Sequence, residues 1–221
     1  MKILVFIPTL NENKNIKKLA DKISSLKYKS DIFVVDDGST DGTINSLKAL
    51  KKKYKHFSFV VRKKRLGYGS AHVLGMCVAI FKKYDFLITM DSDFSHNPSD
   101  IERLVKKIDD NEGCDFVIGS RYCDGGRCDY VGYRKYISIL GNILVRNLLR
   151  IPLKETTTSF RIFRVSKLRE IDFRFMNNDG YSLLFETVYR LKNIQAKMRE
   201  IPIHFRDRDH GESKIPKLQL V

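Results

Sequence analysis

The first 120 residues alternate between short apolar runs and longer amphipathic runs, and this alternation limits the possible folds more than any other feature of the sequence. The strand-like runs are residues 2–8, 31–36, 57–62, 86–90 and 115–119. Helix-like patterns lie between them, near residues 12–26, 41–54, 69–83 and 98–110. Strands that alternate with helices are typical of a parallel sheet with crossover helices. We therefore predict an α/β fold with a mainly parallel central sheet and flanking helices.

The chain is long enough to bury a full hydrophobic core. It has 221 residues, of which 43% are hydrophobic, and no internal repeat or low-complexity linker divides it. We therefore expect a single domain over residues 1–221. The four cysteines form no C-x-x-C pair, which favours reduced thiols and a cytoplasmic setting.

The sequence gives no sign of a segment that crosses a bilayer. The N-terminal "MKILVFIPTLNE" has one basic residue and a brief apolar run, so it fits a first core strand better than a signal peptide. The stretch "ISILGNILV" at 137–145 has nine residues, and a spanning helix needs roughly 20. We therefore expect no spanning helix in this sequence.

Polar or glycine-rich turns follow all five predicted strands. They read "PTLNEN", "DDGSTDGT", "RLGYGSA", "DSDFSHNP" and "GSRY" in chain order. Ligands of open parallel sheets bind beyond the carboxyl ends of the strands. We therefore expect these five turns to form one site.

Two of the turns carry carboxylates suited to a ligand. Asp91 and Asp93 are two residues apart at a strand end, so both side chains can point the same way, toward one hard cation or one group of substrate hydroxyls. Asp37 can accept hydrogen bonds from a nucleobase or a ribose, whereas Asp41 fits a helix cap. For the aspartate pair, two solvated loop acids remain an alternative.

The charge of the chain indicates an anionic partner. Lys and Arg outnumber Asp and Glu by 41 to 26, a net charge of +15. Residues 127–169 hold ten Lys and Arg against two acidic residues, which is +8. Anionic lipid, phosphorylated metabolites and nucleic acid all carry the opposite charge. We do not expect nucleic acid, because the basic residues do not alternate with aromatic stacking residues and acidic residues follow the strands.

Several motifs together resemble one enzyme family. "FIPTLNE", "VVDDGSTDGT", "RLGYGSA" and "MDSD" are similar to motifs of the inverting GT-A glycosyltransferases that use nucleotide-sugars. "GSRY", "YRKYIS", "TTSFRIFR", "GYSLLFE" and "REIPIHFRDRDHGESK" narrow the resemblance to the dolichol-phosphate (polyprenyl-phosphate) mannosyltransferases. The resemblance implies a Rossmann-like GT-A fold and transfer of mannose from GDP-mannose to dolichyl or polyprenyl phosphate, with inversion at the anomeric carbon. It also implies peripheral attachment to the cytoplasmic face of a membrane, directly or through a separate anchoring subunit.

The resemblance also implies roles for individual residues. Residues 1–120 would form the nucleotide-sugar half and residues 121–221 the acceptor half. The guanosine would be surrounded by Pro8, Leu10, Glu12, Val35 and Asp37. The diphosphate and a Mg²⁺ or Mn²⁺ ion would be held by Asp91, Ser92 and Asp93, with Asp93 as the most direct ligand. The donor site would be completed by Arg121, Arg208 and Lys214, and the acceptor phosphate would be received by Arg134 and Ser138.

These roles need no protein base. A divalent ion neutralises the charge that builds on the leaving diphosphate, and the acceptor phosphate is already ionised at neutral pH. We therefore expect the histidines His56, His72 and His96 to be structural or solvated.

Some alternatives stay open in the sequence. The basic and apolar mixture at 134–150 fits an amphipathic helix on an anionic membrane, or a core helix with a solvated basic face. Arg161 and Arg164 fit ordinary surface charges. Leu10 stands where the family has an aromatic residue, which removes a stacking surface near the base. The alternative function is that of a polyprenyl-phosphate glucosyltransferase that uses UDP-glucose, or of a related transferase that acts on a soluble glycan.

Overall fold

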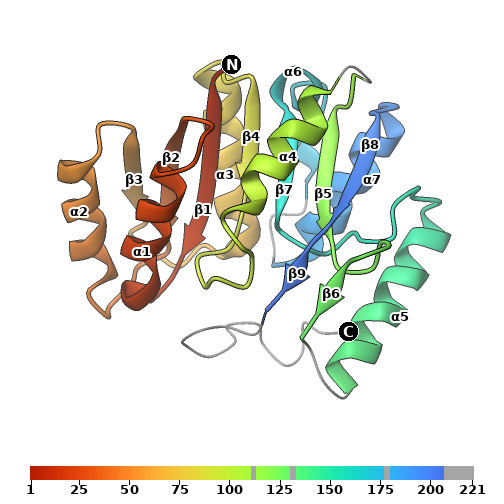
Figure 1. The fold of residues 1–221 in the computed structure, drawn as a ribbon, viewed down its shortest axis with the longest axis horizontal. Helices are drawn as coiled ribbons and strands as arrows, with labels where there is room; N and C mark the ends of the chain where they lie inside the picture. The colour runs from red at the N-terminus through yellow and green to blue at the C-terminus, as the bar shows by residue number, and fades with distance from the viewer. Residues whose placement is uncertain (111–112, 130–132, 177–179, 207–221) are drawn as a thin grey trace.

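The computed structural model describes residues 1–110, 113–129, 133–176 and 180–206, and within them one large sheet organises the molecule. The strand order of this seven-stranded sheet is β3-β2-β1-β4-β7-β5-β8 (Figure 1). Only β7 runs antiparallel to its neighbours, β4 and β5. The strands are β1 (Ile3–Thr9), β2 (Ser30–Asp36), β3 (Phe57–Val61), β4 (Phe86–Thr89), β5 (Phe116–Ser120), β7 (Arg161–Arg164) and β8 (Met198–Pro202).

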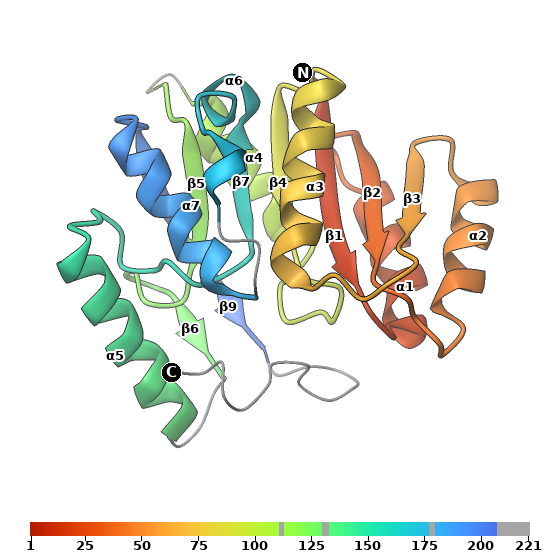
Figure 2. The same cartoon turned by 180° about the vertical axis from the view of Figure 1, so that it is seen from behind.

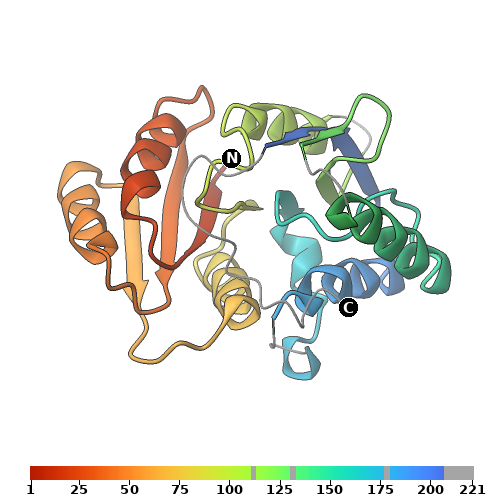
Figure 3. The same cartoon turned by 90° about the horizontal axis from the view of Figure 1, so that it is seen from below.

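Helices cover both faces of the sheet. One face carries α1 (Asn13–Ser24), α2 (Thr43–Lys53) and α4 (Asp100–Asp109), as Figure 1 shows. The other carries α3 (Tyr68–Phe81), α6 (Val165–Leu168) and α7 (Ser182–Asn193), as seen from behind in Figure 2. A view along the strands shows the two helical layers on either side of the sheet (Figure 3).

The two hydrophobic cores follow from the period of two in the strands. In β1, Ile3, Val5 and Ile7 pack under α1, α2 and α4, whereas Leu4 and Phe6 pack toward α3, α6 and α7. Successive strand side chains point to opposite faces, so a continuous apolar run is buried on both. All five predicted strands and all four predicted helices are present, and the α/β prediction is confirmed.

The strand β7 was not predicted, and it joins the two halves of the chain. The short run "RIFR" lies between β4 and β5, with Ile162 opposite Ile88 of β4 and Val117 of β5. The sequence shows that a short run is apolar but not which strands it will pair with. The first 120 residues therefore share their sheet with the rest of the chain.

Two short strands and one helix lie beside the carboxyl ends of the strands (Figures 1 and 2). The strands β6 (Arg127–Cys128) and β9 (His204–Phe205) pair with each other, and η1 (Phe173–Phe175) is a single 3₁₀ turn before α7. The helix α5 (Tyr133–Leu148) lies at the outer side of the molecule in Figures 1 and 2.

The helix α5 is attached by one side only. Val145 packs against the core beneath α3 and α7, while Tyr136, Leu140, Leu144 and Leu148 are between 65% and 76% exposed. These four residues follow the helical period, so they form one apolar stripe that faces outward. This outward stripe favours the amphipathic-helix alternative. Within the described part of the chain, no helix is long and apolar enough to cross a membrane.

Candidate active site

The predicted nucleoside residues gather where β1 and β2 end. Pro8 and Val35 are register partners in the sheet, and the Asp37 N–H donates to the Thr9 carbonyl at 2.9 Å. Glu12 is buried at the start of α1, where its carboxylate accepts a hydrogen bond from the Asn15 amide at 2.7 Å. Leu10 lies between these groups in the chain and is partly exposed. The structure thus brings the five predicted residues to one corner of the sheet.

Asp37 has a structural function that the sequence did not reveal. Its carboxylate accepts the backbone N–H groups of Leu66 and Gly67, at 2.8 and 2.9 Å, and pairs with the Arg62 guanidinium at 2.9 Å. Gly67 has a φ of 85°, a conformation that glycine adopts without a Cβ clash. Asp37 therefore fixes the loop that leads into α3 and ties the ends of β2 and β3 together.

The two aspartates of the D-x-D motif directly follow β4. Asp93 is buried and accepts the Ser95 N–H at 3.0 Å, and Ser92 is buried beside it. Phe94 lies between the bonded residues with a φ of 63°, a left-handed conformation that costs on the order of 1–3 kcal/mol for a non-glycine residue. Such local strain is concentrated at functional sites, because the surrounding structure must hold it in place. The conformation supports a functional role for this turn.

Asp91 differs from Asp93 in its surroundings. Its side chain is 30% exposed, and one oxygen accepts the Tyr68 hydroxyl at 3.1 Å. Burial raises the pKa of Tyr68, so that hydroxyl stays protonated and donates. Burial is also the main cause that raises the pKa of Asp91, and the Asp93 carboxylate adds to it. Two carboxylates that lie together at one strand end fit a site for a divalent cation.

The metal site would be incomplete with protein ligands alone. No group of three or more His, Cys, Asp or Glu side chains suited to a metal occurs in the described residues. Mg²⁺ is commonly bound by one or two carboxylates together with phosphates and water. Asp91 and Asp93 fit this pattern, in which a diphosphate supplies further ligands.

Arg121 is held in a buried ion pair at the end of β5. Its guanidinium donates to both carboxylate oxygens of Glu155, at 2.7 and 3.0 Å, and to the Thr157 hydroxyl at 2.8 Å. Although burial disfavours its charge, Glu155 has a lowered pKa because Arg121 lies beside it. The predicted donor-site residue is therefore also the link between β5 and the segment before β7.

Ser138 belongs to the same hydrogen-bonded network. Its hydroxyl accepts the Tyr122 hydroxyl at 2.7 Å, and its backbone carbonyl accepts the Asn142 amide at 3.0 Å. That amide also donates to Thr157, which Arg121 contacts from the other side. The network places Ser138 on α5 next to the Arg121 pair.

Three predicted residues are not tested by these contacts. Arg134 lies in the first turn of α5, but its side chain lies outside the described residues, as do Arg208 and Lys214 altogether. Their roles remain predictions.

Arg161 is not a surface charge, and that interpretation is wrong. Its side chain is 1% exposed, and it donates to the carbonyl oxygens of Thr156, Thr158 and Leu184 at 2.6 to 2.7 Å. Burial lowers the pKa of Arg161 to about 10, so it stays charged at neutral pH. Arg164 is only partly buried and donates to the Cys114 and Ile108 carbonyl oxygens.

Comparison with known proteins places the chain among enzymes. Residues 4–172 match the family described as glycosyl transferase family 2. The chain belongs to this family. As a member of glycosyl transferase family 2 it is a glycosyltransferase, and the resemblance found in its motifs is confirmed.

Two relatives match almost the whole chain. Undecaprenyl-phosphate mannosyltransferase of Micrococcus luteus is 32% identical over 216 residues, which cover 97% of this chain and 88% of that protein. Dolichol-phosphate mannosyltransferase of Pyrococcus furiosus is 33% identical over 224 residues, covering 97% of this chain and 59% of that protein.

Solved structures share the fold. Glucosyl-3-phosphoglycerate synthase of Mycobacterium tuberculosis, in complex with Mn²⁺, UDP and glucosyl-3-phosphoglycerate, has a TM-score of 0.68. It is 20% identical, and the match covers 94% of this chain and 72% of that chain. The GT-A fold prediction is confirmed.

Sequence reasoning missed three parts of this site. Tyr68 was read only as part of a glycine-rich turn, and nothing in "GYGSA" shows that its hydroxyl reaches Asp91. The ion pair of Arg121 joins residues 34 apart in the chain. The enclosed ring of His96 agrees with the structural alternative, but the sequence did not show that it lies beside Asp91. Only the short distance of His96 from the D-x-D motif in the sequence gave any signal.

Proposed function

We propose that this glycosyltransferase transfers mannose from GDP-mannose to the phosphate of a dolichyl or polyprenyl lipid, with inversion at the anomeric carbon. The observation that carries the proposal is the pair Asp91 and Asp93 at the end of β4. No group of three or more His, Cys, Asp or Glu side chains suited to a metal occurs in the described residues, so a diphosphate donor would supply further ligands to an ion held by this pair. The names of the two mannosyltransferase relatives support the sugar and the acceptor.

The residues divide the chemistry between donor and acceptor. Pro8, Glu12, Val35 and Asp37 would enclose the nucleoside at the corner of β1 and β2. Asp91 and Asp93 would hold Mg²⁺ or Mn²⁺, and that ion, when bound, stabilises the charge on the departing GDP. The carboxylates are therefore the groups on which departure of the leaving group depends.

The acceptor brings its own nucleophile. An ionised phosphate oxygen forms the new bond to the anomeric carbon as the bond from that carbon to the diphosphate breaks. No proton has to be removed from this oxygen, so the protein only has to position it. Ser138 and Arg134 on α5 are the proposed contacts for the acceptor phosphate, and the network through Asn142 and Thr157 would hold Ser138 in place.

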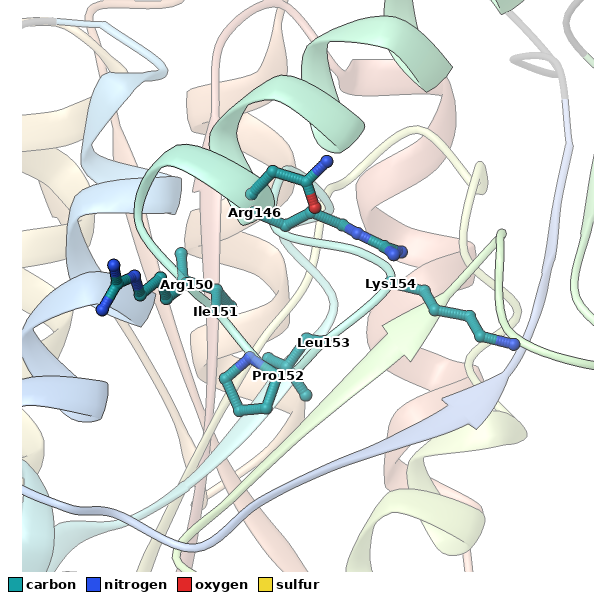
Figure 4. A pocket seen from close by; sticks show the side chains of 7 residues that line it. Arg146, Arg150, Ile151, Pro152, Leu153 and Lys154 are labelled. Carbon is teal, nitrogen blue, oxygen red and sulfur yellow. The ribbon is translucent and has the colours of Figure 1, made fainter.

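A membrane surface is the proposed site of action, because the acceptor is a lipid. The outward stripe of Tyr136, Leu140, Leu144 and Leu148 is apolar, and positive charge lies at the end of the same helix. A depression of about 420 Å³ there is lined by residues that include Arg146, Arg150 and Lys154 (Figure 4). Anionic headgroups attract such clusters, and the apolar stripe would enter the interface.

A transfer assay tests the proposal. Radiolabelled GDP-mannose or UDP-glucose is incubated with polyprenyl phosphate and Mn²⁺, and the lipid product is extracted into organic solvent. We expect label from GDP-mannose in the organic phase, and none after Asp93→Ala, which removes a metal ligand. Label only from UDP-glucose would identify a glucosyltransferase, and activity of Asp93→Ala in metal-depleted buffer would reject the D-x-D assignment. Circular dichroism checks that the variant is folded.

A further inference from the structure

His96 lies behind the D-x-D motif in a fully enclosed position. Its side chain is 0% exposed and stacks on Phe160, with ring centroids 5.2 Å apart and planes at 15°, while Phe205 packs edge-on at 5.2 Å. This enclosed aromatic setting favours the neutral ring, which has one N–H donor and one nitrogen acceptor.

The hydrogen bonds around the ring assign its tautomer. Nε2 lies 3.2 Å from the Thr158 hydroxyl oxygen, which itself accepts the Phe160 N–H at 3.4 Å. The hydroxyl proton of Thr158 is thus available for Nε2, and the imidazole proton then sits on Nδ1. The opposite tautomer would direct the lone pair of Nδ1 toward the Asp91 carboxylate, which is repulsive.

The Nδ1 atom is an unused donor directed at the site. It is buried and has no hydrogen-bond partner among the described residues, and it lies 4.0 Å from Asp91 Oδ2. This distance is about 1 Å too long for a hydrogen bond. The Asp91 side chain is 30% exposed, so it has room to rotate, and Tyr68 already holds its other oxygen.

We propose that His96 is a positioning residue that donates its Nδ1–H to Asp91 when the metal and diphosphate bind. With Tyr68 on one side and His96 on the other, the carboxylate is held in the orientation that contacts the ion. His96 touches neither the metal nor the substrate in this arrangement and acts only through Asp91. The inference rests on the proposed function, because it needs a divalent ion at the D-x-D motif.

Two substitutions of the same ring separate positioning from packing. In His96→Asn the amide nitrogen takes the place of Nδ1, whereas in His96→Gln it takes the place of Nε2. Both variants lose the aromatic stacking on Phe160, so their thermal stabilities should fall by similar amounts. His56→Asn is the control, because His56 directly precedes the edge strand β3 and contacts Ser24, the last residue of α1.

The measurement is binding of Mn²⁺ in the presence of GDP, followed by electron paramagnetic resonance of the free ion. A hydrogen bond to a charged group changes binding by about tenfold or more, so His96→Gln should weaken Mn²⁺ binding by about tenfold. His96→Asn and His56→Asn should stay close to the wild type. In an Asp91→Ala background His96→Gln should have no further effect, because its partner is gone.

The outcomes distinguish this inference from the proposed function. If wild-type protein binds Mn²⁺ with GDP but His96→Gln and His96→Asn bind it equally well, the ring is only a packing element and the inference is wrong. Equal weakening in both variants would also overturn it. Wild-type protein that binds no Mn²⁺ in the presence of GDP would reject the metal site itself, and the inference with it.

Discussion

At the scale of single residues, the charged side chains that matter most are buried ones. Arg121 with Glu155 and Arg161 with three carbonyl oxygens hold the segment before β7 against the ends of β5 and α7. A buried ion pair adds little stability over an apolar pair of equal size, yet removal of one partner is costly. Their position at the carboxyl ends of the strands therefore fits a role at the site better than a role in stability alone.

Glu155→Gln should destabilise the protein, mostly at neutral pH. Removing one partner of a buried pair typically costs about 3–5 kcal/mol, and the folded pKa of Glu155 is lowered by Arg121. The stability that this carboxylate contributes is present above its ordinary pKa of 4.5 and is lost as the pH falls through the lowered folded value. Urea unfolding of both proteins from pH 7 downward checks this. The free energies of unfolding should converge in acid, and a difference independent of pH would contradict the ion pair.

Arg161→Met should lower the free energy of unfolding by about 3 kcal/mol or more, because three buried carbonyl oxygens lose a charged donor. Arg161→Lys should recover only part of the loss, since an ammonium group lacks the planar fork. Arg169→Met is the matched control: its side chain is exposed, and a change within about 0.5 kcal/mol is expected. Urea denaturation measures the free energy of unfolding of all three variants. Equal losses from Arg161→Met and Arg169→Met would mean that the buried contacts of Arg161 do not stabilise the fold.

At the scale of elements, α5 and β7 were the least accessible to sequence reasoning. The alternation of apolar and polar residues predicted β1 to β5 and their helices, because each of these is buried on a face that follows a simple period. The helix α5 has apolar residues on its exposed side, so the same period predicts burial for a side that faces outward. The strand β7 has only four residues, and its place depends on partners far away in the chain.

Leu144→Gln with Leu148→Gln should weaken membrane binding without a loss of stability. Both side chains are exposed, at 65% and 76%, so their replacement empties no core. The wild type should sediment together with anionic vesicles at low salt, and more of it than of the double variant. It should dissociate as salt rises, because charges are screened beyond roughly 10 Å at 0.1 M ionic strength. Phe81→Gln is the control, since Phe81 is 86% exposed at the end of α3. Failure of the wild type to bind vesicles would point to a membrane-anchoring subunit instead.

At the scale of the whole molecule, the site is made where several strands end, and that much was predictable. The five polar turns were expected to meet because parallel strands end at one edge. The contacts within that site were not predictable in the same way. Pro8 with Val35 follows from the register of two neighbouring strands, whereas Tyr68 with Asp91 depends on how a loop folds back over the edge.

The two halves of the chain should unfold together, because β7 is inserted between β4 and β5. Ile162 is fully buried in this strand, so Ile162→Ala should cost about 2–5 kcal/mol. Native-state hydrogen exchange should show the same loss of protection in β1 and β4 of the first half as in β8 of the second. A loss confined to β7 and β8 would mean that the first 120 residues are an independent folding unit.

The position of β7 also sets the boundaries for exchange of parts between related enzymes. Thr89 at the end of β4 lies opposite Arg161 at the start of β7, so the D-x-D turn and the segment that carries Glu155 leave the sheet from adjacent strands. A chimera cut after residue 120 would separate β5 from β7 and open the centre of the sheet. A graft of residues 121–160 alone leaves every strand of the large sheet intact. Under the proposed function, exchange of that segment is therefore the most economical test of which part of the chain sets the acceptor preference.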